Sequence, residues 1–292
     1  MRPEAAALKS LLAAPGLQVM PGCGDGMGAR LIGEAGFRTG FVSGSSISAL
    51  RLAQPDMDLL SWPEMRDALE CCATAAPGVL WLADGDTGHG NAINVQRVVH
   101  AFAHAGAACI LIEDKQWPRA LGSKGAKLVV DREPARLRIR AAAEACRAAG
   151  ILLLARTDAR VSRGFDEARA RIEDFVAEGA DVLFLDSPQS EAEMRDGVAA
   201  CAGRPSISVT APSGRHYMPD DATLERLGIK VAVYPQHLLA AGVHAGRAVL
   251  AGLRGGAMPE LGSPEALAGA IRTAGYLAED ARLAGREGSG SV

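Results

Sequence analysis

Apolar runs recur along the chain at intervals that suit alternating strands and helices. Most of these short runs are continuously apolar, which is typical of strands buried on both faces of a parallel sheet. The eight expected strands span residues 17–22, 39–44, 78–86, 108–114, 151–158, 180–186, 206–210 and 230–235. Segments with helical periodicity lie between them, and several end in glycine, a common signal at the C-terminus of a helix.

The alternation of strand and helix, repeated eight times, predicts a (β/α)8 barrel of the α/β class. The chain has 292 residues, which suits one such barrel of roughly 250 residues. No linker divides the sequence, so we expect a single domain over residues 1–284. Residues 264–284 predict one extra C-terminal helix, and the tail 285–292 is expected to be flexible.

Composition narrows the classes of function. Apolar residues make up 48 % of the chain and charged residues 22 %, so a large core is expected. The net charge of −3 and the lack of a long basic run argue against nucleic-acid binding. No stretch reaches the roughly 18 apolar residues of a membrane span, and the N-terminus lacks the apolar segment of a secretory signal. We therefore expect a cytoplasmic protein whose cysteines are mostly reduced core residues.

Polar residues follow each expected strand, at the position where the strand ends. In a barrel these ends meet at one rim, which is where active sites form. The polar residues are mostly Asp, Glu, Arg and Ser, whereas ordinary polar loops would also bring Lys and Asn. This composition favours a functional rim.

Asp84 and Asp86 lie two residues apart at the end of the third expected strand, and strand alternation would place both side chains on the same face. Two carboxylates so close to each other favour a cation nearby. Glu113 from the next strand would complete a cluster of oxygen ligands, which suits Mg²⁺, with Mn²⁺ possible, and does not suit zinc. The alternative interpretation is a polar turn that leads into the next helix.

Other rim residues suit an anionic substrate. Arg156 carries a planar fork of donors that matches a carboxylate. Ser43, Gly44 and Ser45 supply hydroxyl and backbone N–H donors of the kind that hold an anionic oxygen.

Two histidines are further candidates. His89 lies between Gly88 and Gly90, where the backbone can approach a ligand closely. It could donate to an anion, or it could merely cap the loop. His237 follows the last expected strand and could act as a catalytic acid or base, or be structural.

A series of strings in a fixed order gives the chain a resemblance to a known family. The strings are PGCGDGMGARLIGEAGF, VSGSSISA, Pro-Asp at 55–56, ADGDTGHGNAINVQRVV, IEDKQW, ARTDA and GADVLFLDSP. Over roughly residues 10–255 the chain resembles the isocitrate lyase / phosphoenolpyruvate mutase superfamily. The resemblance implies a barrel with a C-terminal helix swapped between subunits, a homodimer or homotetramer, and Mg²⁺. It also implies a small 2-oxo or 2-hydroxy di- or tricarboxylate substrate.

The resemblance also implies roles for single residues. Asp186 stands where the family usually has Glu, one methylene longer. The positions that match the family's metal site are Asp84, Asp86, Asp56 and Glu113, of which Asp56 matches an acid that hydrogen-bonds metal waters. The positions that match the substrate site are Ser43, Gly44, Ser45 and Arg156.

The loop after the fourth strand departs from the lyases of the family. Those lyases carry a catalytic cysteine in Lys-Arg-Cys-Gly-His, and Leu121 stands in its place here. Ser208 and Ala211 replace the Asn and Glu that bind the distal carboxylate in malate-type lyases. The loop PRALGSK is more similar to that of the oxaloacetate decarboxylases, whose histidine after the last strand matches Gln236 or His237.

We therefore expect a Mg²⁺-dependent decarboxylase of oxaloacetate or a close 2-oxo diacid, in which loss of CO₂ leaves a metal-stabilised enolate. The expected catalytic residues are Arg156, Glu113 and His237. One alternative is a lyase on a 2-hydroxy polycarboxylate of the 2-alkylmalate or methylisocitrate type. It needs another acid in place of Leu121, for which Cys23, just past the first strand, is a conceivable substitute. Another is a metabolite-binding homologue without catalysis.

Overall fold

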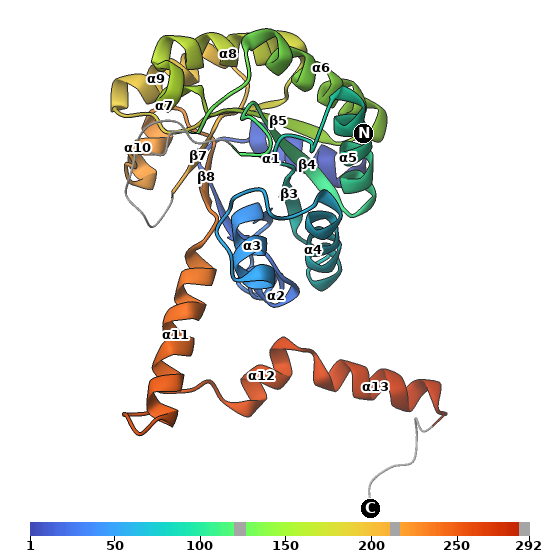
Figure 1. Cartoon of the computed structure of the whole chain (residues 1–292). Helices are drawn as coiled ribbons and strands as arrows, with labels where there is room; N and C mark the ends of the chain where they lie inside the picture. The colour runs from blue at the N-terminus through green and yellow to red at the C-terminus, as the bar shows by residue number, and fades with distance from the viewer. Residues whose placement is uncertain (120–126, 211–216, 286–292) are drawn as a thin grey trace, which may run out of the picture. The chain divides into compact units, whose positions relative to one another are not determined.

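The computed structural model describes residues 1–119, 127–210 and 217–285, and within them it confirms the (β/α)8 barrel (Figure 1). Each expected strand overlaps one observed strand, and all pairs of neighbouring strands are parallel. The strands are β1 (Gln18–Cys23), β2 (Thr39–Val42), β3 (Leu80–Asp84), β4 (Ala107–Glu113), β5 (Leu152–Thr157), β6 (Val182–Leu185), β7 (Ile207–Val209) and β8 (Val231–Tyr234).

The sheet closes on itself. Its strand order is β6-β5-β4-β3-β2-β1-β8-β7, and a parallel bridge between Leu183 and Ser206 joins the two outer strands. The backbone N–H of Leu183 donates to the carbonyl of Pro205 over 3.0 Å. Closure brings the ends of all eight strands to one rim, as the sequence predicted.

Helices follow the strands, and those between β1 and β8 cover the outside of the barrel. In the described residues the helices are α1 (Pro3–Ala13), α2 (Gly26–Glu34), α3 (Gly44–Leu52), α4 (Trp62–Ala75), α5 (Ala92–His104), α6 (Arg132–Ala149), α7 (Ala159–Arg163), α8 (Phe165–Glu178), α9 (Glu191–Ala200), α10 (Asp221–Arg226), α11 (His237–Leu253), α12 (Pro264–Ala270) and α13 (Thr273–Leu283). The sequence analysis predicted neither α1, α3 nor α7. Residues 264–284, predicted as one helix, form two, because Arg272 adopts a left-handed conformation with φ of 59°.

The core has two layers. Continuous apolar strands bury one face against the surrounding helices and the other face inside the barrel, as expected for a parallel sheet. Helix α1 contributes Ala5, Leu8 and Leu12 to the interior layer, where they pack near the first residues of the strands. Thus α1 covers the end of the barrel opposite the functional rim.

The chain forms two compact units, Met1–Ala240 and Ala241–Val292. The first holds the barrel, and the second holds most of α11 together with α12 and α13. That residues 1–284 form one domain stays a prediction. Of the tail predicted to be flexible, residues 286–292 lie outside the described residues.

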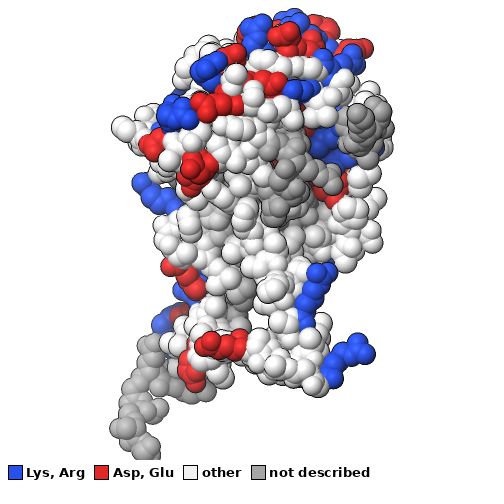
Figure 2. Space-filling view, turned by 90° about the vertical axis from the view of Figure 1, so that its left-hand side faces the viewer, with Lys and Arg blue, Asp and Glu red and all other residues white. Residues whose placement is uncertain are grey.

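The outer surface is mixed in charge. Figure 2 shows Lys and Arg interspersed with Asp and Glu at the top of that view. Ion pairs between α6 and α8 include Arg132–Asp174 and Arg140–Glu178. Within the described parts of the chain, no helix is long and apolar enough to cross a bilayer.

Candidate active site

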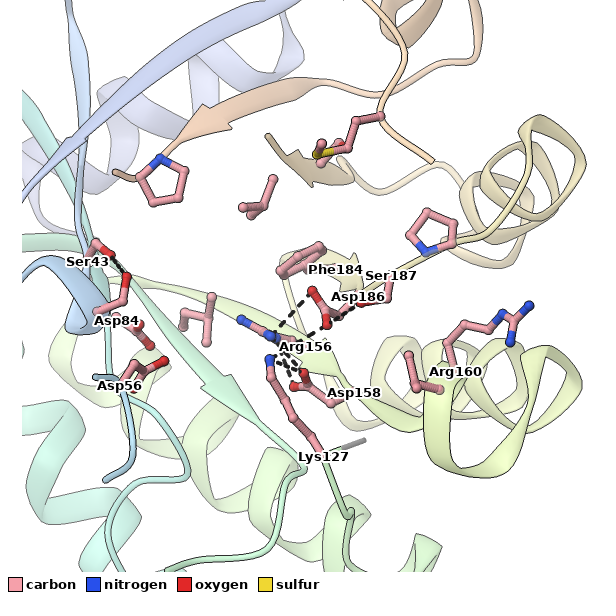
Figure 3. A pocket seen from close by; sticks show the side chains of 18 of the residues that line it. Ser43, Asp56, Asp84, Lys127, Arg156, Asp158, Arg160, Phe184, Asp186 and Ser187 are labelled. Carbon is pink, nitrogen blue, oxygen red and sulfur yellow. Dashed lines mark hydrogen bonds and ion pairs between the residues drawn. The ribbon is translucent and has the colours of Figure 1, made fainter. Parts of the chain in front are cut away.

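A cavity of about 890 Å³ opens at the rim where the strands end. Figure 3 shows Asp56, Asp84 and Ser43 on one side of it and Asp158, Asp186 and Lys127 on the other, with Arg156 between them. The described residues that line it are Phe41, Ser43, Ser45, Asp56, Asp84, Leu111, Lys127, Arg156, Asp158, Arg160, Val161, Phe184, Asp186, Ser187, Pro188, Gln189, Ser208, Val209, Tyr217, Met218, Pro235 and Gln236.

Asp84 and Asp86 occupy different kinds of backbone. Strand β3 ends at Asp84, and Asp86 lies in the following turn with φ of 48°. The expectation that strand alternation aligns the two side chains was therefore wrong, because the strand ends two residues earlier than predicted. Instead, Asp84 lines the cavity and the turn carries Asp86 to a buried lysine behind it.

That lysine is Lys115, which follows β4 and is only 1 % exposed. Its Nζ lies 2.7 Å from Oε1 of Glu113 and 3.0 Å from Oδ1 of both Asp58 and Asp86. The sequence analysis missed Asp58 and Lys115. The available signals were the second acid in Pro-Asp-Met-Asp and the lysine in Glu-Asp-Lys.

Together with Asp56, these acids form a dense carboxylate cluster. Asp56, Asp58 and Asp86 each bring one oxygen to within 4.8 Å of the others. Oδ2 of Asp58 is buried and has no hydrogen-bond partner among the described residues. We call Asp56, Asp58, Asp84, Asp86 and Glu113 the acid cluster.

Burial makes Asp84 and Asp86 of the acid cluster hard to ionise. It raises the pKa of Asp84 to about 6, and the charges of Glu113 and Asp56 add to the effect. It raises the pKa of Asp86 to about 8, with the charge of Asp84 as the next cause. Lys115 and Arg119 do not balance all of these carboxylates, so a further cation would be favoured here. The donors are all oxygens, which fits Mg²⁺ or Mn²⁺.

Arg156 is the penultimate residue of β5 and is held along one edge of its guanidinium group. Asp158 accepts from Nε over 2.9 Å and from Nη2 over 2.7 Å. Glu113 Oε2 lies 3.2 Å from Nε, and Asp186 Oδ1 lies 3.4 Å from Nη2. Nη1 takes part in none of these contacts. Because Arg156 lines the cavity, Nη1 is left to bind a carboxylate.

The predicted anion loop is the start of a helix. Ser43 caps α3, so the first backbone N–H groups and the positive end of the helix dipole lie at the cavity. The hydroxyls of Ser43 and Ser45 lie 2.9 Å apart, and Gln236 donates to Ser45 over 3.1 Å.

Comparison with known proteins identifies the chain's relatives. The sequence model of the phosphoenolpyruvate phosphomutase family matches residues 8–254. The chain belongs to this family. It is 36 % identical to 2,3-dimethylmalate lyase of Eubacterium barkeri, over 79 % of each chain. It is also 36 % identical to oxaloacetate decarboxylase of Paraburkholderia xenovorans, over 64 % of this chain and 62 % of the relative. A solved phosphonopyruvate hydrolase complex with oxalate and Mg²⁺ superposes with a TM-score of 0.84 at 27 % identity, over 96 % of this chain and 98 % of the other.

The two predicted histidines lie away from the cavity lining of this family member. His89 has a side chain that is 4 % exposed, packs edge-on against Trp117 and lies 3.9 Å from Oδ2 of Asp86. Burial lowers its pKa to about 4. His237 begins α11 and packs against the ring of Tyr234, whereas its neighbour Gln236 lines the cavity.

The remaining predicted residues divide between described and undescribed parts of the chain. Asp56 lines the cavity and pairs with Arg119 over 2.9 Å, and Ser208 is also in the lining. Cys23 is buried beside Cys72 and does not line it. Leu121, most of the loop PRALGSK, and Ala211 lie outside the described residues.

Proposed function

We propose that the protein is a carbon–carbon bond lyase that decarboxylates oxaloacetate or a close 2-oxo diacid, with Mg²⁺ as cofactor and Mn²⁺ as a possible substitute. One observation carries the proposal. Asp56 and Asp84 of the acid cluster line the cavity together with Arg156 and the serines at the start of α3, and no cysteine occurs in its described lining. This arrangement offers a cation site and a carboxylate site but no thiol acid.

The acid cluster would hold the metal ion, with Asp84, Asp86, Asp56 and Glu113 as the proposed ligands or bonded to its waters. The unpartnered Oδ2 of Asp58 and the raised pKa values of Asp84 and Asp86 support a cation here. When bound, the ion would act as a Lewis acid for the negative charge that develops on the 2-oxo oxygen. The oxalate and Mg²⁺ complex of the phosphonopyruvate hydrolase supports the same pairing.

Arg156 would bind the substrate carboxylate through Nη1, and Ser43 and Ser45, on either side of Gly44, would donate to the same anionic group. The backbone N–H of Gly44 itself donates to Asp84. The bond between C3 and the leaving carboxylate then breaks and CO₂ departs. The electron pair of that bond is delocalised onto C3 and the 2-oxo oxygen. A proton from solvent then returns to C3. Carbon dioxide leaves without a proton, so the missing loop cysteine is no obstacle.

The second candidate is cleavage of a 2-hydroxy polycarboxylate. The 36 % identity to 2,3-dimethylmalate lyase over 79 % of the chain favours it. This reaction begins with removal of the proton of the 2-hydroxyl group. Carboxylates of the acid cluster with raised pKa, such as Asp84, are suited to accept it.

A substrate panel tests the proposal. The protein is incubated with Mg²⁺ and either 2-oxo diacids or 2-hydroxy diacids, and pyruvate and CO₂ are measured separately. Decarboxylation of oxaloacetate releases both in equal amounts, whereas cleavage of an alkylmalate releases a 2-oxo acid without CO₂. Failure of every 2-oxo diacid to yield CO₂ would rule out the leading proposal.

A pair of arginine variants links the activity to the site. Arg156→Gln should raise KM by at least tenfold, because it removes a charged hydrogen bond to the substrate. Arg160→Gln is the matched control, since Arg160 also lines the cavity but has Nε and Nη2 paired with Glu193. Equal effects of the two substitutions would remove the special role of Arg156.

We also propose that the chain is a homodimer or homotetramer in which C-terminal helices are exchanged between subunits. Large apolar side chains on α11 and α13 support this, because Leu250, Leu253, Tyr276 and Leu277 are all more than 60 % exposed. Sedimentation of the wild type and of Leu277→Glu tests the proposal. A monomeric wild type would contradict it. The cytoplasmic location stays a prediction.

A further inference from the structure

A buried ion pair lies behind the cavity and takes no direct part in it. Arg171 of α8 is 1 % exposed, Asp114 after β4 is 0 % exposed, and Nη1 of Arg171 lies 3.0 Å from Oδ2 of Asp114. Neither residue belongs to the cavity lining. Burying two charges is costly unless their remaining hydrogen-bonding groups are satisfied, so the partners of this pair are informative.

The other partners of Asp114 belong to the turn after β5. Oδ2 accepts a hydrogen bond from the hydroxyl of Thr157 over 2.7 Å, and Oδ1 accepts one from the backbone N–H of Asp158 over 2.9 Å. Thr157 is fully buried and Asp158 nearly so. One carboxylate therefore fixes both the hydroxyl and the backbone of the turn that carries Asp158.

Asp158 in turn holds Arg156. Its two oxygens pair with Nε and Nη2 of the guanidinium, which leaves Nη1 for a ligand. A continuous line of contacts thus runs from Arg171 through Asp114 and the β5 turn to Arg156. Every residue that links Arg171 to Arg156 is buried, so a shift at one end has little room to be absorbed.

We propose that Asp114 is a positioning residue for Arg156. By fixing the turn that carries Asp158, Asp114 keeps the guanidinium of Arg156 directed toward the substrate carboxylate. The inference rests on the proposed function, in which Arg156 binds that carboxylate. Residues that support a binding group contribute to affinity through its orientation, and misplacement of about 1 Å can cost up to a hundredfold. A purely structural role would instead lower stability and leave binding by the folded protein unchanged.

Titration calorimetry with oxalate at saturating Mg²⁺ measures the effect. Asp114→Asn should raise the Kd of oxalate about tenfold, because the amide cannot accept all three hydrogen bonds. Thr157→Val removes one of these bonds with little change of shape and should raise the Kd about threefold. The Kd of Mg²⁺, measured without oxalate, should stay within twofold for both variants.

Glu167→Gln is the matched control. Glu167 also pairs with Arg171, over 2.8 Å, but is partly exposed and does not contact Asp114. Its replacement should leave the Kd of oxalate within twofold. If Asp114→Asn does not fold, the Kd of oxalate is compared between Thr157→Val and Glu167→Gln instead. A higher Kd in Thr157→Val alone supports the inference, and equal values contradict it.

A double-mutant cycle separates positioning from structure. In an Arg156→Lys background, Asp114→Asn should change the Kd of oxalate by less than twofold, because Asp114 acts through Arg156. Two results would overturn the inference and leave the proposed function intact. One is that Asp114→Asn raises the Kd of oxalate by the same factor in the Arg156→Lys background as in the wild type. The other is a wild-type Kd in both Asp114→Asn and Thr157→Val. A wild type that fails to bind oxalate with Mg²⁺ would overturn both.

Discussion

The backbone N–H of Gly44 donates a hydrogen bond to Oδ2 of Asp84 over 3.2 Å. Gly44 is the first residue of α3, and Asp84 is the last of β3. A β-carbon at position 44 would lie 3.0 Å from the same oxygen. The start of α3, which carries the proposed substrate donors, is therefore in direct contact with the proposed metal site, and a β-carbon at position 44 would be tightly placed between them.

Gly44→Ala should weaken Mg²⁺ binding several-fold without changing any charge, because the added methyl group presses on Asp84. The added β-carbon would also lie 3.2 Å from Cε of Met65, so the methyl group has little room to move away from Asp84. Calorimetric titration with Mg²⁺ measures the change. Gly78→Ala is the control, since a β-carbon there meets nothing within 4 Å. Equal affinities in the two variants would contradict the close contact.

Asp84→Asn should reduce metal-dependent turnover by about a thousandfold or more, in the range seen when a group that stabilises transition-state charge is lost. The same substitution should not lower the melting temperature of the metal-free protein, because it removes a carboxylate whose ionised form is disfavoured by burial. Asp67→Asn, at an exposed position on α4, is the control and should leave turnover unchanged. Turnover near the wild-type level in Asp84→Asn would exclude Asp84 from the site.

Stability should depend on pH through Asp84 and Asp86. Their pKa values in the folded protein, about 6 and about 8, lie above the ordinary value of 3.8. Between pH 4 and these values the unfolded chain has released protons that the folded chain retains, so metal-free stability falls as pH rises. Mg²⁺ competes with those protons, so its stabilising effect should grow from pH 5 to pH 8.

Urea unfolding with and without Mg²⁺ at several pH values checks this dependence. Asp84→Asn should flatten the metal-free curve between pH 4 and pH 6. A stabilisation by Mg²⁺ that is the same at pH 5 and pH 8 would speak against the raised pKa values.

Lys115→Met should destabilise the metal-free protein by about 3–5 kcal/mol, because it leaves buried carboxylates without their shared cation. The ammonium lies within 3.0 Å of oxygens from Asp58, Asp86 and Glu113. Mg²⁺ should recover part of this loss by replacing the missing positive charge. Lys9→Met, at an exposed position on α1, should change the free energy of unfolding by no more than about 0.5 kcal/mol. Urea denaturation measures the stability of both variants. A Lys115→Met variant as stable as the wild type would show that Lys115 does not stabilise the buried carboxylates.

Gln236→Ala should raise KM several-fold, because it removes the hydrogen-bond donor to Ser45 and lets the hydroxyls of Ser43 and Ser45 reorient. His237→Ala should change kcat and KM by less than twofold, because His237 packs on Tyr234 and is not in the cavity lining. Steady-state kinetics on the best substrate compares the two neighbours. A large loss of kcat in His237→Ala alone would restore it as the acid or base.

The strands could be predicted well because each is a continuous apolar run between polar ends, and burial on both faces leaves no other arrangement for eight of them. The candidate site could be predicted in part for the same reason. Asp84, Glu113 and Arg156 all lie within the last two residues of a strand, and barrel closure brings those ends together. The short α3 was missed, since its first turn consists of glycine and serine, which are weak helix formers.

The sequence by itself determined the barrel, the rim and the types of residue that gather there, because these follow from local apolar pattern and strand length. Only the tertiary structure decided which acids share Lys115, which edge of Arg156 stays open, and that Gln236 faces the cavity. Those contacts join residues far apart in the chain, such as Asp58 with Lys115 and Ser45 with Gln236. Their geometry depends on backbone turns with positive φ and on how the strands register, and neither has a periodic signal in the sequence.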